Sequence, residues 1–166
     1  ASLPFARLVA GPRDLLAPLY ETDAFKTWAD ENSDLRMEVR YFNMEGTSID
    51  PVRLEQGSDF VAEVTLTHPG IRTHYKEMAL TQMFPSGWEI RNLRLDNMES
   101  SRVKNQPEYQ DIRDDRVYSY FGLKKGETKT FVVLLNAAYQ GEFYLPAVYC
   151  EAMYDNEIPA TRAGKW

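Results

Sequence analysis

Cysteine is almost missing from this chain, because Cys150 is the only one among 166 residues. A single cysteine excludes an internal disulfide and a zinc site built from cysteines. Cys150 stands in an alternating apolar segment between Val148 and Ala152. We therefore predict that its thiol is buried in the core and chemically inert.

Long apolar runs and an excess of basic residues are missing as well. No segment approaches the ~20 apolar residues of a transmembrane helix, and no basic stretch followed by an apolar one resembles a signal peptide. The formal net charge is -6, and this balance argues against nucleic acid as a partner. We expect the chain itself to be soluble. Because it begins with Ala1 rather than Met, we interpret it as a mature form or an excised fragment.

Recognisable catalytic and metal-binding motifs are absent from the sequence. It contains no GxSxG, no Walker glycine loop and no dinucleotide-binding fingerprint. His68 and His74 flank a turn-like segment without the spacing of metal ligands, so we interpret both as solvated loop histidines. We predict that the chain has no catalytic residue, no cofactor and no metal site.

Two neighbouring carboxylates, Asp114 and Asp115, are the nearest approach to an acid/base pair. If the segment is extended, their side chains point to opposite faces and cannot share a substrate. Pairing with Arg113 or Arg116 is the interpretation that this geometry favours.

What the sequence does contain is a repeated alternation of apolar and polar residues. With 43% hydrophobic and 27% charged residues, the composition is that of one globular domain. A period of two is typical of strands with one buried face. It recurs in residues 35–43, 59–67, 75–84, 87–93, 116–123, 127–139 and 141–154. Seven or more short strands separated by turns favour an all-β, antiparallel β-sandwich.

Three segments depart from simple alternation. Residues 131–135 are apolar on both faces, which predicts a central strand that is covered on both sides. Residues 21–33 predict a short helix that is capped by Thr22 or Asp23 and decorates the sandwich. Residues 94–111 are polar without a period, which predicts a long surface loop or crossover.

The closing segment predicts a hairpin with an apolar tip. Inward-facing Ala152 places Met153 outward by alternation, with Tyr154 at the bend. Asp155-Asn156 is the predicted two-residue turn, because both residue types tolerate positive φ. Met153 and Tyr154 either fold back onto loops of their own domain or contact another domain or chain. The alternation alone leaves both interpretations open.

Several stretches, in this order, resemble one known family. They are VRYFNMEGTSIDPVRLEQGSDFVAEVTL, FPSGWEIRN, EYQDIRDDRVYSYFGLKKGETKTFVVLLNAAYQGEFYLPAVYCEAMYD and IPATRAGK. Together they resemble the last macroglobulin-like domain of the bacterial alpha-2-macroglobulins. The resemblance implies a β-sandwich that is a non-catalytic part, near the C-terminal end, of a much longer chain. The resemblance further implies that the parent traps endopeptidases and lies in the periplasm or cell envelope as a lipoprotein.

The resemblance also implies partners and a role for the hairpin. The partners are the other domains of the parent, notably a thioester-bearing helical domain, and target proteases through the parent. The match to EAMYD assigns Met153 and Tyr154 to an interdomain contact that shields the thioester from water. The thioester motif itself is absent from these residues, and Cys150 does not stand in such a motif. Residues 12–33 do not follow the family pattern, and we interpret them as an insertion.

Two other functions compete with the inhibitor domain. The first is a stand-alone β-sandwich of a bacterial surface that binds carbohydrate or protein through aromatic residues such as Trp28, Trp88 or Tyr154. The second is a small hydrolase whose active site consists of residues scattered along the sequence.

Overall fold

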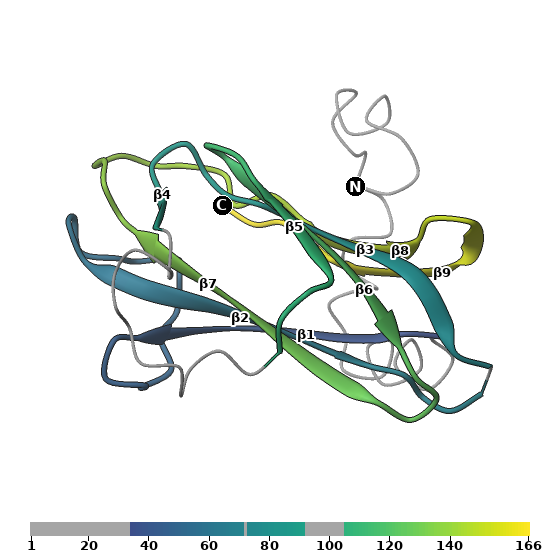
Figure 1. Ribbon diagram of the computed structural model, residues 1–166. Helices are drawn as coiled ribbons and strands as arrows, with labels where there is room; N and C mark the ends of the chain where they lie inside the picture. The colour runs from purple at the N-terminus through teal and green to yellow at the C-terminus, as the bar shows by residue number, and fades with distance from the viewer. Residues whose placement is uncertain (1–33, 72, 92–104) are drawn as a thin grey trace, which may run out of the picture. The chain divides into compact units, whose positions relative to one another are not determined.

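A two-layered antiparallel β-sandwich makes up the described part of the chain (Figure 1). The computed structural model describes residues 34–71, 73–91 and 105–166, of which residues 155–159 are described by their backbone alone. The strands are β1 (Arg36–Asn43), β2 (Asp59–Thr67), β3 (Tyr75–Met83), β4 (Glu89–Arg91), β5 (Tyr109–Ile112), β6 (Arg116–Leu123), β7 (Thr128–Asn136), β8 (Val148–Ala152) and β9 (Asp155–Arg162). One sheet has the order β1-β2-β7-β4 and the other β5-β6-β3-β8-β9. The predicted fold class is confirmed.

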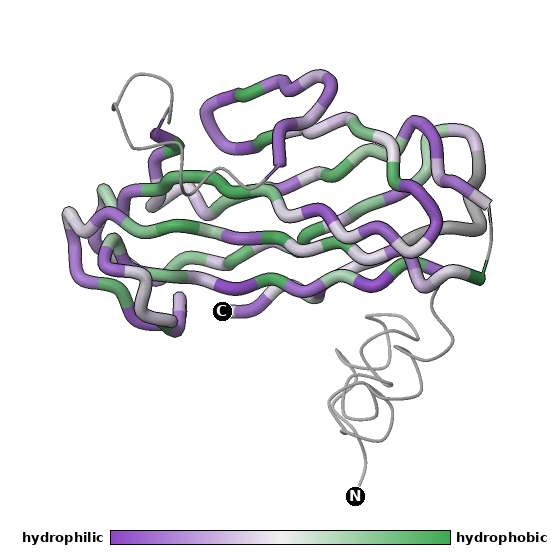
Figure 2. Tube along the Cα trace, turned by 60° about the horizontal axis from the view of Figure 1, so that its bottom comes forward, coloured by the Kyte–Doolittle hydropathy of each residue, from purple (hydrophilic) through white to green (hydrophobic). Residues whose placement is uncertain are grey.

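The period-two pattern predicts the buried face of the strands correctly. In β2, Phe60, Ala62, Val64 and Leu66 are buried at every second position. Figure 2 shows hydrophobic and hydrophilic residues interleaved along the strands. Because successive side chains of a strand point to opposite faces, such a pattern buries one face of each sheet against the other sheet.

The prediction of a central strand at residues 131–135 is also confirmed. β7 pairs with β2 on one side and with β4 on the other. Both Val133 and Leu134 are buried, although neighbouring residues of a strand face opposite sides. Coverage of both faces explains why this strand reads as an unbroken apolar run.

The core divides into two groups of packed side chains along the sandwich. In the first, the rings of Phe121 and Phe131 meet across the two sheets with centroids 4.7 Å apart. In the second, the ring of Phe60 packs edge-on against Trp88 at 4.8 Å. Truncating a buried phenylalanine to alanine typically costs about 3–5 kcal/mol. These contacts therefore contribute substantially to the stability of the domain.

The predicted long loop at residues 94–111 needs a correction. Its last residues form part of β5, in which Tyr109 pairs with Tyr120 of β6. The segment is short and lies at a sheet edge, so its alternation is too brief to read from the sequence. Residues 92–104, the predicted helix at residues 21–33 and the proposed insertion at residues 12–33 lie outside the described residues.

Two different sets of connections occupy the ends of the sandwich. Figure 1 shows the β8–β9 hairpin at one end, and the loops that follow β1 and β7 at the other. The edge strands β1 and β9 come close to each other across the two layers. Burial there raises the pKa of Tyr41 to about 12, an effect that nearby Arg162 partly opposes.

Candidate functional site

The turn between β8 and β9 consists of Met153 and Tyr154, which we call the hairpin tip. Ala152 pairs with Asp155, so the chain reverses through two residues. The predicted turn at Asp155-Asn156 is therefore wrong, and these two residues begin β9. Met153 is 50% exposed and Tyr154 is 81% exposed. Their predicted outward position is confirmed.

An irregularity in β9 explains why the turn falls two residues early. Glu151 pairs with Pro159, whereas its neighbour Ala152 pairs with Asp155. Residues 156–158 are thus additional on the β9 side, as in a bulge. Because the bulge takes up these residues, the apolar pair occupies the bend itself.

The hairpin tip is anchored by a second irregularity, in β3. Glu77 has a φ of 53°, the left-handed region that non-glycine residues rarely adopt, and the register shifts between Tyr75 and Met78. The carbonyl oxygen of Glu77 accepts a hydrogen bond from the Met153 N–H at 3.0 Å. Backbone strain of this kind persists where the surrounding structure requires it. Here it positions the tip.

The strand that leads into the tip separates buried from outward residues as predicted. Val148, Cys150 and Ala152 are buried, and burial raises the pKa of the Cys150 thiol to about 12. The thiol is therefore protonated at neutral pH. Its predicted burial is confirmed, and its inertness stays a prediction. On the outer face, the Tyr149 hydroxyl donates a hydrogen bond to the Glu151 carboxylate at 2.7 Å.

His68 is buried, so its interpretation as a solvated histidine is wrong. Its Nδ1 accepts the Gly70 N–H at 2.9 Å, which leaves Nε2 protonated to donate to the Thr73 carbonyl oxygen at 2.7 Å. The imidazole stacks on Tyr75 with the ring centroids 3.9 Å apart. A polar ring with both nitrogens satisfied is tolerated in a core, and it stabilises the β2–β3 loop. His74, by contrast, is exposed as expected.

The neighbouring carboxylates are arranged for structure. Asp115 forms a bidentate ion pair with Arg116, with N···O distances of 2.7 and 2.8 Å. The Arg116 hydrogen bonds hold the pKa of the Asp115 carboxyl below its ordinary value. The favoured pairing with arginine is confirmed. Asp114 and Asp115 lie in the turn between β5 and β6, and the segment is not extended there.

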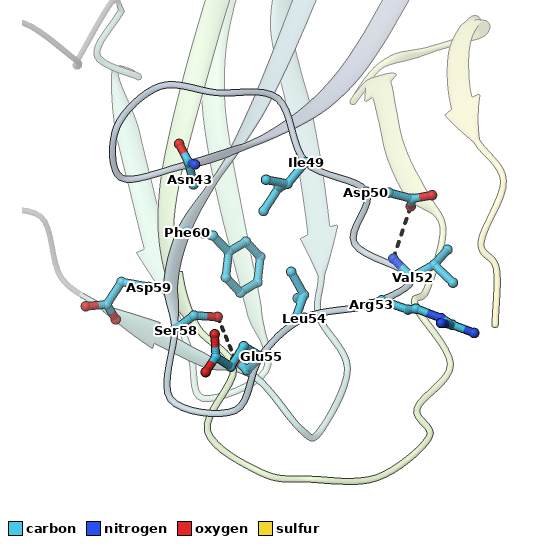
Figure 3. A pocket seen from close by; sticks show the side chains of 10 residues that line it. All are labelled: Asn43, Ile49, Asp50, Val52, Arg53, Leu54, Glu55, Ser58, Asp59 and Phe60. Atoms are coloured by element: carbon cyan, nitrogen blue, oxygen red, sulfur yellow. Dashed lines mark hydrogen bonds between the residues drawn. The ribbon is translucent and has the colours of Figure 1, made fainter.

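A hollow of about 530 Å³ lies in the loop between β1 and β2 (Figure 3). Figure 3 shows Ile49 and Leu54 beside the ring of Phe60, with carboxylates at the rim. The pKa of Asp50 is lowered chiefly by the Val52 N–H and also by Lys165. An ionised, hydrogen-bonded carboxylate of this kind is not suited to proton transfer near neutral pH.

The described residues contain no cluster of three or more His, Cys, Asp or Glu side chains that could bind a metal ion. In the same ranges there is no helix that is long and apolar enough to cross a membrane. That the chain has no catalytic residue, cofactor or metal stays a prediction.

Trp88 is not the freely exposed aromatic that the surface-binder alternative assumes. Its ring packs against Phe60, Tyr41 and Phe84, and only part of it is accessible. Trp28 lies outside the described residues. Of the aromatic residues named for that alternative, only Tyr154 is largely exposed.

The nine strands that the structure describes form a sandwich of two antiparallel sheets, which is the fold of a macroglobulin-like domain. A family model described as the bacterial alpha-2-macroglobulin MG10 domain matches residues 35–157. The chain therefore belongs to this family, as its resemblance implies.

Named relatives agree with this assignment. The alpha-2-macroglobulin of Pasteurella multocida is 29% identical over 133 residues, which is 79% of this chain and 7% of the relative. An alpha-2-macroglobulin homolog of Yersinia pestis is 29% identical over 141 residues, which is 67% of this chain and 7% of the relative. The chain thus spans about 7% of the length of these curated relatives.

Solved structures of such proteins share the fold. Escherichia coli alpha-2-macroglobulin activated by porcine elastase matches with a TM-score of 0.70 at 20% identity, over 81% of this chain and 13% of that one. Salmonella alpha-2-macroglobulin reacted with methylamine matches with a TM-score of 0.68 at 21% identity, over 78% of this chain and 9% of that one. In both of these solved structures, the matched domain is a small part of a much larger chain.

Proposed function

We propose that this domain is a non-catalytic part of an endopeptidase-trapping alpha-2-macroglobulin, and that its hairpin tip covers a thioester in a neighbouring helical domain. The observation that carries the proposal is the exposure of Met153 and Tyr154 at a turn whose backbone is hydrogen-bonded to β3. The parent lies in the periplasm or cell envelope, where a lipid at its N-terminus anchors it.

The shape and chemistry of the tip suit this role. A two-residue turn is narrow, and both of its side chains project from the end of the sheet. Methionine adapts to an irregular surface, and tyrosine combines a large apolar ring with a hydroxyl that can meet a polar rim. Inserted beside a thioester, such a pair excludes the water and small amines that attack the acyl carbon.

The anchoring of the tip supports the same conclusion. Because Glu77 holds the Met153 N–H, little backbone freedom is lost when the tip docks. A contact that is ordered before binding keeps more of its interaction energy as affinity. The tip can therefore stay in place until a rearrangement of the parent withdraws it.

The relatives support the chemistry of the proposal. One has been solved after activation by porcine elastase, an endopeptidase, and another after reaction with methylamine. Methylamine is a small nucleophile that cleaves an accessible thioester. We infer that the parent of this domain responds to the same two kinds of reagent.

The test uses the intact parent protein with Met153→Ala and Tyr154→Ala combined. We expect methylamine to be incorporated about tenfold faster or more, since burial of one large apolar side chain contributes ~1.5–3 kcal/mol. Tyr109→Ala is a matched control, because Tyr109 is 63% exposed and lies on β5, at the opposite edge of the same sheet. Its rate should equal that of the wild type.

Two results would contradict the proposal. If the double variant incorporates methylamine at the wild-type rate, the tip does not shield the thioester. If the parent incorporates none, even after proteolytic activation, it has no thioester to shield.

A further inference from the structure

A second hollow, of about 570 Å³, lies at the end of the sandwich that carries the loops after β1 and β7. We call it the aromatic hollow, because Trp88, Tyr139, Phe143 and Trp166 contribute to its wall. Its volume falls within the range of about 300–1,000 Å³ that is common for small-molecule sites. These residues come from three separate segments of the chain, so no local sequence motif marks the site.

Glycines hold the aromatic walls in place. A Cβ at Gly87 would overlap the ring of Phe143. A Cβ at Gly164 would overlap the hydroxyl end of Tyr144, which is not part of the wall but contacts the wall residue Trp166. Each ring thus packs directly on backbone, which only glycine allows. The Tyr139 N–H also donates to the Gly87 carbonyl oxygen at 3.1 Å. The hollow is therefore formed before any ligand arrives.

Two of the rings leave large surfaces accessible. Tyr139 is 60% exposed, and its hydroxyl donates to a Glu89 carboxylate oxygen at 3.3 Å. Trp166 is 81% exposed and meets Tyr144 edge-on with the centroids 5.4 Å apart. The two contacts orient these rings while their faces remain available for stacking.

The charged side chains of the hollow balance one another. Lys165 is paired with Asp50 at 3.2 Å. Asp50 does not itself line the hollow, whose remaining charged side chains are one cation, Arg53, and one anion, Glu142. The amides of Gln56 and Gln140 add neutral hydrogen-bonding groups. The site therefore has no excess charge that would select a phosphate or a quaternary ammonium ligand.

We propose that the aromatic hollow binds a neutral carbohydrate. A sugar ring presents an apolar C–H face, which stacks on an aromatic ring, and a rim of hydroxyls, which bond to amide, carboxylate and guanidinium groups. The lining offers both kinds of partner side by side. A docked protein would instead need a dry apolar centre with the charged groups at the rim. The inference is independent of the hairpin tip, which lies at the other end of the sandwich.

The test titrates this chain with maltotriose, cellotriose and chitotriose, and follows its three tryptophan indole N–H signals by NMR. We expect at least one trisaccharide to shift the Trp88 and Trp166 signals saturably, with the same Kd in low and high salt. Tyr139→Ala and Trp166→Ala should each raise that Kd about tenfold through the loss of a stacking face. Both residues are largely exposed, so the variants should fold normally.

Tyr109→Ala is the matched control, and it should leave the Kd unchanged. Its tyrosine is as exposed as Tyr139 but belongs to β5. The proposal is overturned if none of the three sugars shifts the tryptophan signals up to its solubility limit. It is also overturned if the Kd of Tyr139→Ala and Trp166→Ala equals that of the wild type. Binding restricted to charged saccharides and lost in high salt would equally contradict a neutral ligand.

Discussion

The two ends of the sandwich both expose large apolar side chains, but they hold them in different ways. At the hairpin tip, the backbone is hydrogen-bonded to β3 while Met153 and Tyr154 project outward. At the aromatic hollow, the rings of Phe143 and Tyr144 lie on glycine backbone. One end relies on backbone pairing, and the other on side-chain packing.

This difference separates two kinds of recognition. A convex tip with an ordered backbone can enter a recess of a neighbouring domain, and it contributes little to the stability of its own domain. A concave surface built from packed rings can receive a ligand, and the same packing stabilises the fold around it. Exposed apolar area alone does not distinguish these cases, whereas the contacts beneath each side chain do.

The largest effect is expected when the packing at the aromatic hollow is broken. In Gly87→Ala, the new methyl group overlaps the ring of Phe143, and overpacking of this kind typically costs about 1–3 kcal/mol. We expect a lower midpoint in urea unfolding with an unchanged slope. Ser86→Ala, at the exposed neighbouring position, is the control and should unfold like the wild type. A Gly87→Ala domain of wild-type stability would show that the ring moves aside freely.

A smaller effect of opposite sign is expected beneath the hairpin tip. Glu77→Gly removes the strain of the left-handed backbone, which costs the folded state roughly 1–2 kcal/mol. It also makes the unfolded chain more flexible, which destabilises the fold by about 0.5–1 kcal/mol. The net expectation is a gain of up to about 1.5 kcal/mol in the free energy of unfolding, measured in urea. Lys76→Gly is the matched control: Glu77 is the only non-glycine residue with a positive φ in the described ranges, so Lys76→Gly should lose stability. Equal losses in both variants would mean that Glu77 is unstrained.

The strands and the burial of the thiol can be predicted from the sequence because alternation reports directly on burial. Cys150 is buried because it lies on the same face of the strand as the apolar residues Val148 and Ala152. The predicted turn lies two residues too late, because Asp155-Asn156 has the better turn propensity and a bulge in β9 overrides it. The pairing of β8 with β9 sets the register there.

Two other features depend on contacts that no local pattern encodes. His68 is buried because the β2–β3 loop folds its own amide and carbonyl groups around the imidazole. In the sequence, the only indication of burial is the position of His68 at the end of an alternating strand. That position does not distinguish a solvated imidazole from a buried one whose nitrogens are both hydrogen-bonded. The aromatic hollow joins residues as distant as Arg53, Trp88 and Trp166, so its existence follows from topology alone.

The smallest effect is expected at the hairpin tip itself, where it can be measured through Cys150. Burial raises the pKa of this thiol to about 12, so a thiol reagent at pH 8 reacts only after the strand opens. Because Tyr154 is 81% exposed, Tyr154→Ala should change the free energy of unfolding by less than about 0.5 kcal/mol and leave the labelling rate unchanged. Leu80→Ala is the positive control, since buried Leu80 pairs with Cys150 across β3 and β8 and its truncation should cost about 2–5 kcal/mol and speed labelling. Faster labelling in Tyr154→Ala would mean that the tyrosine holds β8 in place, and the tip would then be part of the fold rather than a surface kept for a partner.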